Sequence, residues 1–340
     1  MTRPRMGVVG LGMALKPHAQ SYADLADRLE LALAWSPSEA RRKAAAAEYG
    51  LPMADSLEQI LGDGTISMVS ILTPPNTHLE LVEACAVAGK HVLLEKPLDV
   101  SSDRARALVA ACDRAGVTLG VVLQHRFRAP GERLGALLRE GALGRIVAAS
   151  VAVPNWRPQT YYDQPGRGTL ARDGGGVLIT QAIHTLDLFI SLVGLPQEVF
   201  AYAATTPVHR METEDLVTGS LRFADGALGS LLATTTAYPG LPETITVIGE
   251  KATASIAGTS LSLRYHDGRT EEFTDEASQG GTGADPMAFP NDFHRALIVD
   301  FLDAVEHRRP PRISGHEALK VHRLIDGLLE SAETGGTVVL

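Results

Sequence analysis

Residues 5–15 read RMGVVGLGMAL, a short apolar run that ends in a turn containing Gly10 and Gly12. A helical pattern follows at residues 18–27, so the turn stands between an expected strand and an expected helix. This is most of the dinucleotide-binding fingerprint G-x-G-x-x-G, with Leu15 in place of the third glycine. Gly10 would permit the tight turn, and Gly12 would let the backbone approach a pyrophosphate at the helix N-terminus. The alternative is a glycine turn that only reverses the chain.

Strands and helices alternate through the first part of the chain. The apolar runs predict strands at residues 5–10, 29–35, 66–73, 91–95 and 118–124. Helical patterns lie between them at residues 18–27, 39–49, 56–61, 77–88 and 102–115. Such alternation indicates βαβ units, and strands that are apolar throughout indicate a sheet covered on both faces. We therefore predict an α/β, Rossmann-type, doubly wound parallel sheet in a dinucleotide-binding domain over residues 1–125.

The rhythm changes after about Arg126, where strand-like runs follow one another without crossover helices. They lie at residues 146–153, 199–204, 216–223, 227–235, 243–248, 253–257 and 260–265. Such a series predicts an α+β domain with a large, open, mainly antiparallel sheet. We assign residues 126–340 to this substrate-binding and oligomerisation domain.

The same part of the chain holds three helical patterns and one irregular segment. The helices are expected at residues 176–193, 292–307 and 315–333. The last of them are free to pack back on the first domain. Residues 276–290 are rich in Gly and Pro and are expected to form a mobile loop.

The composition is that of an acidic globular protein, with a net charge of −9 and a pI of about 5.7. That balance argues against nucleic acid as a partner, because nucleic acid binds basic surfaces. We find no apolar run as long as the ~18–20 residues that a membrane span needs. Cys85 and Cys112 have neither metal-binding nor disulfide spacing. We therefore expect a cytoplasmic protein without a metal site or a membrane partner.

The end of the second expected strand bears on the choice of cofactor. A cofactor with a free ribose 2′-hydroxyl usually meets Asp or Glu at this place. This chain has Ser36 instead, with Arg41 and Arg42 in the next helical turn. Hydroxyl and guanidinium groups suit a 2′-phosphate, so the sequence slightly favours NADP(H) over NAD(H). Alternatively, both arginines only solvate the helix surface.

A second glycine-rich stretch, DGGGVLITQAIHTLD, covers residues 173–187. Glycines at a helix start allow close approach of a backbone or ligand. Thr180, His184 and Asp187 are four and then three positions apart, so a helix places them on one face. His184 titrates near neutral pH and is a candidate acid/base group. The alternative is a core histidine whose ring Asp187 holds.

Four features, taken in order, resemble the Gfo/Idh/MocA oxidoreductase family over essentially the whole chain. They are Gly10 and Gly12 with His18, the triplet Glu95-Lys96-Pro97, the stretch QHRF at residues 124–127, and residues 174–187. The resemblance implies NAD(P)-dependent interconversion of alcohols and carbonyls on sugars, cyclitols and related cyclic polyols. It also implies a homodimer or homotetramer that pairs through the open face of the second sheet.

The resemblance further implies that Lys96 and His184 are the catalytic residues. The family often has Asp four residues before the histidine, whereas this chain has Thr180, with Gln181 beside it. Threonine does not accept a proton near neutral pH, so Lys96 and His184 become the stronger candidates for the catalytic base. Hydride transfer from an alcohol carbon requires a group that takes the hydroxyl proton, and such groups contribute ~10²–10⁴-fold.

The other expected contacts lie at strand ends and in loops. We expect cofactor contacts at Gly10, Gly12, Met13, Ala14, Ser36, Arg41, Thr73, Pro74, Asn76, His78, Glu95, Lys96 and Gln124. We expect substrate contacts at Lys96, Arg126, Trp156, Arg157, Tyr161, Thr180, Gln181 and His184. Aromatic faces and arginine forks suit polyols, but loop aromatics equally often cover a sheet edge.

Three other functions stay open at this point. One is a dehydrogenase of aromatic-ring cis-dihydrodiols, and a second is a glycosidase that uses bound NAD⁺ transiently. The third is a non-catalytic nucleotide sensor or regulator on the same fold, for which Thr180 in place of Asp leaves room.

Overall fold

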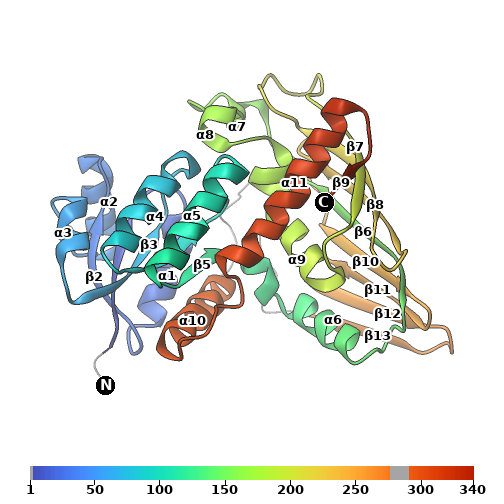
Figure 1. The fold of residues 1–340 in the computed structure, drawn as a ribbon, viewed down its shortest axis with the longest axis horizontal. Coiled ribbons are helices and arrows are strands. Elements are labelled where there is room, and N and C mark those ends of the chain that lie inside the picture. Colours follow the sequence, from blue (N-terminus) through green and yellow to red (C-terminus); the bar gives the residue numbers. More distant parts are fainter. Residues whose placement is uncertain (1–2, 276–290) are drawn as a thin grey trace. The chain divides into compact units, whose positions relative to one another are not determined.

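Within residues 3–275 and 291–340, which the computed structural model describes, five parallel strands form the first sheet (Figure 1). They are β1 (Arg5–Val9), β2 (Glu30–Trp35), β3 (Ile66–Ile71), β4 (His91–Glu95) and β5 (Leu119–Val122), in the order β2-β1-β3-β4-β5. β3 and β5 are buried almost throughout, because helices cover both faces of a doubly wound sheet. The predicted parallel, Rossmann-type sheet is confirmed.

The helices around this sheet also match the predicted patterns. They are α1 (Leu15–Asp24), α2 (Glu39–Tyr49), α3 (Leu57–Gly62), α4 (His78–Val87) and α5 (Ser102–Ala115), with the 3₁₀ turn η1 (Pro75–Thr77) before α4. α4 packs against α5, and α1 packs against the late helix α10 (Asp292–Glu306). α1 begins three residues earlier than its pattern predicts, so it starts directly after the glycine turn.

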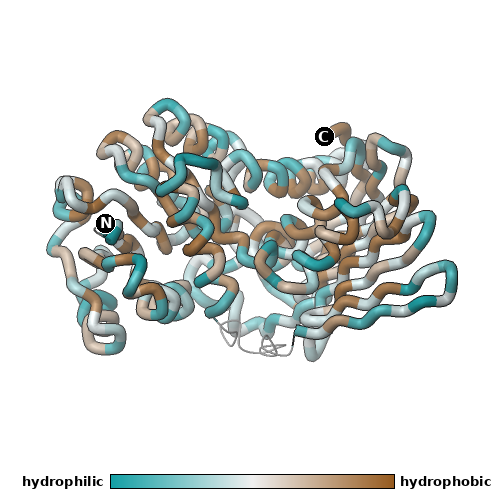
Figure 2. The backbone as a smooth tube through the Cα atoms, turned by 90° about the horizontal axis from the view of Figure 1, so that it is seen from below, coloured by the Kyte–Doolittle hydropathy of each residue, from teal (hydrophilic) through white to brown (hydrophobic). Residues whose placement is uncertain are grey.

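The second sheet has nine strands in the described part of the chain. They are β6 (Ile146–Pro154), β7 (Glu198–Ala204), β8 (Leu216–Arg222), β9 (Leu228–Thr234), β10 (Thr244–Gly249), β11 (Ala252–Ala257), β12 (Ser260–Tyr265), β13 (Thr270–Thr274) and β14 (Val338–Val339). Their order is β13-β12-β11-β10-β6-β9-β8-β7-β14, and among these pairs only β6 and β9 run parallel. The prediction of a large, mainly antiparallel sheet is confirmed. Figure 2 shows apolar stretches along these strands, mixed with more polar ones, and hydrophilic turns at their ends.

Helices cover one face of this sheet. They include α6 (Ala129–Arg139), α9 (Ile183–Val193) and the later part of α11 (Gly315–Thr334), and short turns lie at η2 (Gln124–Phe127), α7 (Gln159–Tyr162) and α8 (Leu170–Asp173). α6 contacts α9, β11 and β12, and α9 contacts β6. The Ser331 hydroxyl of α11 accepts the Ala201 N–H of β7 at 3.0 Å. One sheet face is therefore a core, and the other lacks these helices.

The structure corrects several expectations. The helix predicted at 176–193 is present over residues 177–193, but its first part, η3 (Leu178–Ala182), is a π-helix that leads into α9. α6, β13 and β14 were not predicted. β13 is a largely exposed edge strand of sequence TEEFT, and β14 is only two valines long, so neither shows the apolar period of a strand. The loop expected at 276–290 lies outside the described residues.

The chain divides into two compact units. Unit 1 comprises Met1–Leu123 and Asn291–Leu319, and unit 2 comprises Gln124–Pro290 and Lys320–Leu340. Our boundary from the sequence stood after residue 125, with the return of the last helices left open. In the structure α10 joins unit 1, and α11 passes from unit 1 into unit 2.

One segment of unit 2, Leu170–Val193, is long and apolar enough to cross a membrane by length and composition alone. Our statement that the sequence has no such run is therefore wrong. However, 67% of its most apolar window is buried inside the structure, which is also the behaviour of a core helix.

Candidate functional site

The glycine turn after β1 lies at the point where the strand order of the first sheet reverses. β1 has β2 on one side and β3 on the other, and ligands of such sheets bind where the order changes. Gly10 has φ = 100°, and a Cβ at Gly10 would lie 2.7 Å from Leu72 C and 2.8 Å from Thr73 N. The turn is thus pressed against the loop after β3, and only glycine fits there.

The N-terminus of α1 is free to bind an anion. Ala14 stands at its N-cap position without a side-chain cap, and the first turn contains no acidic residue. A Cβ at Gly12 would meet, among the described residues, nothing nearer than Arg41 Nη1 at 3.8 Å. The Leu15 N–H donates to Gly12 O at 3.1 Å and Pro17 has no N–H, so the positive end of the helix dipole and the open glycine are the features that suit the pyrophosphate of a dinucleotide. The exposed Met13 side chain flanks this turn.

Ser36, Arg41 and Arg42, the residues considered for cofactor preference, differ in what they contact. Ser36 is buried and its carbonyl accepts a hydrogen bond from Arg42 Nη1 at 2.5 Å, so Arg42 holds the end of β2. Arg41 is exposed, its backbone N–H is capped by Ser38, and its guanidinium lies near Gly12. Of the two arginines, Arg41 is the one placed beside the phosphate turn.

His78 ties two loops of unit 1 together. Its Nε2 lies 2.9 Å from Thr73 O, and its Nδ1 lies 3.0 Å from Pro97 O. The ring is fully buried, and burial lowers its pKa although the carbonyl hydrogen bonds oppose this. The structure therefore gives His78 a role in holding the loops. Pro74 and Asn76, in the loop after β3, are exposed.

Lys96 follows β4 at the carboxyl edge of the same sheet. Its backbone N–H donates to Glu95 Oε2 at 3.1 Å, and the Lys96–Pro97 peptide is cis. The other Glu95 oxygen accepts a hydrogen bond from His18 Nε2 at 2.8 Å. Burial opposes ionisation of Glu95, but the His18 hydrogen bond and nearby positive charge outweigh it, so the pKa lies below its usual value. An ionised carboxylate thus links α1 to the residue that precedes Pro97.

A second histidine completes the environment of His18. The His294 ring packs edge-on against the His18 ring with centroids 5.1 Å apart. Ligand atoms of His18, Glu95 and His294 lie within 4.8 Å of one another, a spacing that a metal ion could use among the described residues. The sequence spacing did not indicate this group. The direct His18–Glu95 hydrogen bond accounts for the contact without an ion.

In unit 2, the glycine run opens the π-helix for a reason that the sequence does not show. A Cβ at Gly176 would lie 1.9 Å from Glu214 O. The Glu214 carboxylate accepts the N–H groups of Gly176 at 3.0 Å and Leu178 at 3.2 Å, and burial raises its pKa. The run therefore makes room for Glu214, which caps the helix. The Thr180 hydroxyl bonds Gly176 O at 2.5 Å and also contacts Gln181 Oε1.

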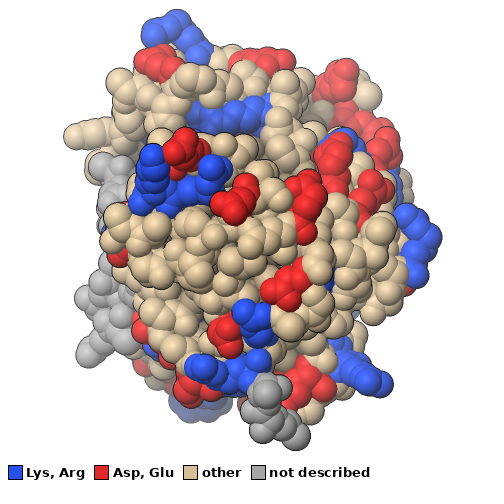
Figure 3. Space-filling model, turned by 90° about the vertical axis from the view of Figure 1, so that its left-hand side faces the viewer, with Lys and Arg blue, Asp and Glu red and all other residues tan. Residues whose placement is uncertain are grey.

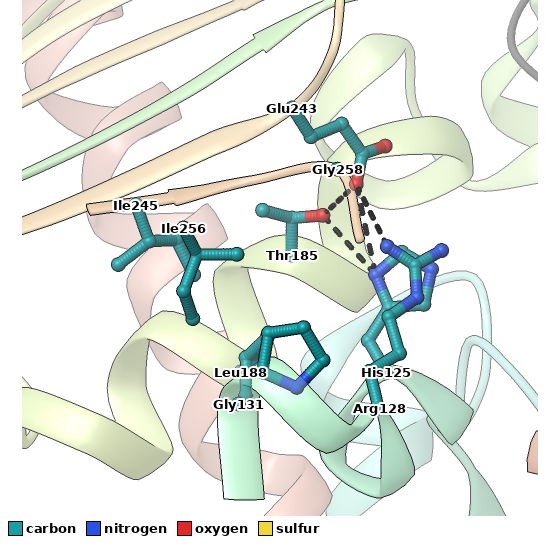
Figure 4. A pocket seen from close by; sticks show the side chains of 10 residues that line it. His125, Arg128, Gly131, Thr185, Leu188, Glu243, Ile245, Ile256 and Gly258 are labelled. Carbon is teal, nitrogen blue, oxygen red and sulfur yellow. Dashed lines mark hydrogen bonds and ion pairs between the residues drawn. The ribbon is translucent and has the colours of Figure 1, made fainter. Parts of the chain in front are cut away.

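His184, half-buried on α9, stacks on His125 with ring centroids 4.9 Å apart and an interplanar angle of 31°. His125 Nδ1 lies 3.2 Å from Thr185 Oγ1, and Thr185 donates a hydrogen bond to Glu243. The same Glu243 oxygen lies 3.7 Å from Arg128 (Figure 4). Figure 4 shows these polar groups at one end of a pocket whose other end is lined by Leu188, Ile245 and Ile256. A polar cluster thus stands directly behind His184.

Asp187 forms a two-pronged ion pair with Arg126. Its two oxygens accept hydrogen bonds from Arg126, at 2.7 Å from Nε and 2.6 Å from Nη2. Both side chains are almost completely buried. Through this pair Arg126, which we expected to contact substrate, joins η2 to α9. Gln124, the first residue of η2, is buried too.

The expected substrate loop is anchored by a buried histidine. His209 Nδ1 lies 2.8 Å from Asp215 Oδ2, and His209 Nε2 lies 2.8 Å from Arg157 O. Trp156 precedes Arg157 in the sequence and Tyr161 follows it. The Arg157 guanidinium carbon lies 5.8 Å from the centre of the Tyr161 ring. The structure thus places Trp156, Arg157 and Tyr161 in one anchored loop.

Several residues of these networks were not predicted as site residues. They are Thr185, Glu243, His209, Asp215 and Glu214. Their partners are between 6 and about 60 positions away in sequence, so no local spacing connects them. A weak signal existed for His125, which stands inside the QHRF stretch at the start of η2.

Comparison with known proteins adds independent information. The family model "Oxidoreductase family, NAD-binding Rossmann fold" of GFO_IDH_MocA matches residues 4–123, and the "GFO/IDH/MocA C-terminal domain" matches residues 132–255. D-xylose 1-dehydrogenase (NADP(+)) 2 of Haloferax volcanii is 31% identical, with 98% of each chain covered. Myo-inositol 2-dehydrogenase of Thermotoga maritima is 27% identical over 92% of this chain and 91% of its own.

A solved structure aligns over the full length. The WlbA dehydrogenase of Bordetella pertussis, in complex with NADH and UDP-GlcNAcA, has a TM-score of 0.86 and 32% identity. The alignment covers 100% of this chain and 99% of that chain.

Proposed function

Because this chain belongs to the Gfo/Idh/MocA oxidoreductase family, we propose that it is an NAD(P)-dependent dehydrogenase of a sugar, cyclitol or related cyclic polyol. One observation carries the proposal. The uncapped α1 N-terminus and Lys96 stand at the carboxyl edge of one parallel sheet, and Glu95 with His18 links them. An anion-binding turn and a proton-transfer group at the same edge are what such a reaction requires.

The chemistry assigns roles to two side chains. Oxidation of a CH–OH group releases a hydride from carbon and a proton from oxygen. The bound nicotinamide supplies the hydride acceptor. Lys96 and His184 are the proposed catalytic residues, which hold the hydroxyl and accept its proton or return it in the reverse direction. Thr180 is engaged with Gly176 and Gln181, so it serves as a hydrogen-bonding residue and not as the base.

For the cofactor we favour NADP(H) slightly over NAD(H). Support comes from the absence of a carboxylate at Ser36 and from Arg41 beside the phosphate turn. The names of two relatives, D-xylose 1-dehydrogenase (NADP(+)) 2 and scyllo-inositol 2-dehydrogenase (NADP(+)) IolW, point the same way. NADH in the structure of the WlbA dehydrogenase points to NAD(H).

We further propose a homo-oligomer that pairs through the second sheet. Large apolar side chains are exposed on its strands, at Tyr202, Leu228, Leu232 and Ile248. Changing Leu232 to Glu should then shift the molar mass measured by light scattering toward the monomer, whereas Val87→Glu, on an exposed helix end of unit 1, should not.

A cytoplasmic location fits the two buried, unpaired cysteines, Cys85 and Cys112.

Small-molecule partners are favoured over nucleic acid, because basic and acidic side chains intermix on the face that Figure 3 shows.

The test is the absorbance of reduced nicotinamide with a panel of pyranoses, inositols and aromatic cis-dihydrodiols, each with NAD⁺ and NADP⁺. Turnover of a sugar or cyclitol supports the proposal and measures the cofactor preference. Turnover of cis-dihydrodiols alone would replace the polyol substrate class. Nucleotide binding without any turnover would instead favour the sensor, or the NAD-using glycosidase if a glycoside is cleaved.

A further inference from the structure

The loop that carries Trp156, Arg157 and Tyr161 contains an arrangement that neutral sugars do not require. Arg157 donates its backbone N–H to Thr235 O at 2.9 Å, and its carbonyl accepts from His209 Nε2 at 2.8 Å. His209 and its partner Asp215 are fully buried. The backbone at Arg157 is therefore fixed from both sides, and its side chain projects from a rigid point.

Two guanidinium groups gather at the Tyr161 ring. The Cζ of Arg167 lies 5.0 Å from the ring centre, and that of Arg157 lies 5.8 Å from it. Cation–π contact holds each group near the ring. Two like charges in a half-buried place repel each other, so the arrangement needs compensating negative charge.

Among the described residues, one carboxylate contributes to that charge. Asp173 Oδ1 is 3.6 Å from Arg167 Nη1, while its other oxygen accepts the Gly168 N–H at 2.9 Å. Arg157 Nη1 donates to Trp156 O at 2.7 Å. Within the described residues, the Nε atoms of Arg157 and Arg167 are buried and have no hydrogen-bond partner. These two atoms bring no negative partner to the guanidinium groups, so an oxyanion that meets the outer Nη atoms would balance charge that is otherwise uncompensated.

We propose that Arg157 and Arg167 form an oxyanion subsite at Tyr161, so that the substrate is an acidic sugar. A planar guanidinium fork matches a carboxylate or a phosphate better than a hydroxyl. The shared chemistry is an oxyanion attached to the polyol, either a sugar carboxylate or a sugar phosphate. This inference rests on the proposed dehydrogenase function and narrows its substrate class.

The redox step itself is unchanged by the acidic group. The oxidised carbon loses a hydride to NAD(P)⁺ and its hydroxyl loses a proton to the enzyme, while the oxyanion stays intact. The subsite acts on binding and orientation, so its effect belongs mainly in KM.

Matched substrates test the proposal directly. KM and kcat are measured with the preferred cofactor for two series of sugars. In the first, glucose is compared with glucuronate and with glucose 6-phosphate. In the second, galactose is compared with galacturonate. We expect an acidic sugar to have a KM at least tenfold lower than its neutral parent. A preference for the uronates over the sugar phosphate, or the reverse, identifies the oxyanion.

The arginines are then changed singly. Arg157→Gln and Arg167→Gln should each raise KM for the acidic sugar about 10- to 100-fold, and raise KM for the neutral parent sugar by a clearly smaller factor. Arg167→Lys should lie between, because it keeps the charge but loses the fork. The matched control is Arg210→Gln, an exposed arginine near the same loop, which should change neither KM.

Binding gives a readout that does not depend on turnover. An acidic sugar should raise the melting temperature of the enzyme–NAD(P)H complex, and the Arg→Gln variants should lose that shift while they keep the shift caused by the cofactor. One outcome would overturn the subsite but keep the proposed function. In it, the enzyme oxidises neutral sugars, shows no preference for acidic ones, and keeps its kinetic constants in both arginine variants. Arginine-dependent binding of acidic sugars without any turnover would keep the subsite and overturn the proposed activity.

Discussion

At the scale of single residues, Lys96 is the side chain on which the proposed chemistry depends most. Lys96→Met keeps the length of the side chain but removes its proton-carrying nitrogen. We expect turnover to fall about 10²–10⁴-fold while the Kd for the nucleotide stays within a few-fold. Stopped-flow absorbance and nucleotide fluorescence measure the two quantities. Lys43→Met, at an exposed lysine on α2, is the control, and turnover in Lys96→Met equal to that of this control would remove Lys96 from the mechanism.

His18 is a positioning residue that acts through Glu95. His18→Leu removes the hydrogen bond at 2.8 Å that helps to keep the Glu95 pKa low, so that pKa should rise. The carboxylate would then be lost at a higher pH, and the acid limb of kcat/KM should move upward by about one unit. Tyr22→Phe is the control, because its hydroxyl faces the other ring nitrogen at 3.4 Å and leaves the Glu95 contact in place. Superimposable pH profiles for His18→Leu and Tyr22→Phe would show that His18 only fills space.

Single residues also differ in how far the sequence alone predicts their contacts. Gly10 was predictable, because a tight turn after a strand leaves few alternatives to glycine. The pairing of Asp187 with Arg126 was not predictable from helical spacing, which relates Asp187 only to residues of its own helix. Arg126, 61 positions away, takes Asp187 because a buried carboxylate is stabilised best by a two-pronged guanidinium. Helical spacing finds neighbours on one element but cannot find the neighbour that the tertiary fold brings.

At the scale of elements, the π-helix η3 depends on the glycines before it. Gly176→Ala places a methyl group where Glu214 O lies 1.9 Å away, so the segment before β8 or the helix start must move. We expect the free energy of unfolding to fall by about 3 kcal/mol. Turnover should fall too, because η3 leads directly into the helix that carries His184. Urea denaturation followed by circular dichroism measures the first effect.

Gly62→Ala is the matched control for this change. Gly62 ends α3, and a Cβ there would meet no described atom within 4 Å. Alanine favours a helix over glycine by up to about 1 kcal/mol, so this variant should be neutral or slightly more stable. Equal unfolding midpoints for both variants would mean that the contact with Glu214 does not constrain the glycine run.

Elements with a strong apolar period were predictable, and those that depend on neighbours were not. The five strands of the first sheet were found because each is mostly apolar, and β3 and β5 are buried almost throughout. β13 escaped because an edge strand needs few apolar residues, and its pairing with β12 is made by the backbone. The π-helix escaped because its extra residue per turn is set by Glu214 and not by the period of its own sequence.

At the scale of the whole molecule, buried histidines should make stability depend on pH. Burial lowers the pKa of His294 to about 3 and that of His322 to about 4, whereas an unfolded histidine titrates near 6.5. The native state therefore keeps both rings neutral while the unfolded chain takes up protons. Stability is complete above pH 6.5 and falls as the pH decreases toward 4, by about 1.4 kcal/mol per pH unit for each ring.

The two units allow this loss to be measured separately. His294 lies in unit 1 and His322 in unit 2, and the two tryptophans, Trp35 and Trp156, also lie one in each unit. A Trp35→Phe background reports unit 2 through Trp156 fluorescence, so urea midpoints at pH 7.5 and 5 give its pH dependence alone. His322→Leu should make that dependence smaller by about 2 kcal/mol, whatever its effect on absolute stability. His307→Leu, at an exposed position of unit 1, should leave it unchanged. If unit 2 loses as much stability at pH 5 in the His322→Leu variant as in the background chain, the acid sensitivity of this unit arises from other groups. The buried carboxyl of Glu214 is not one of them, because its raised pKa acts in the opposite direction.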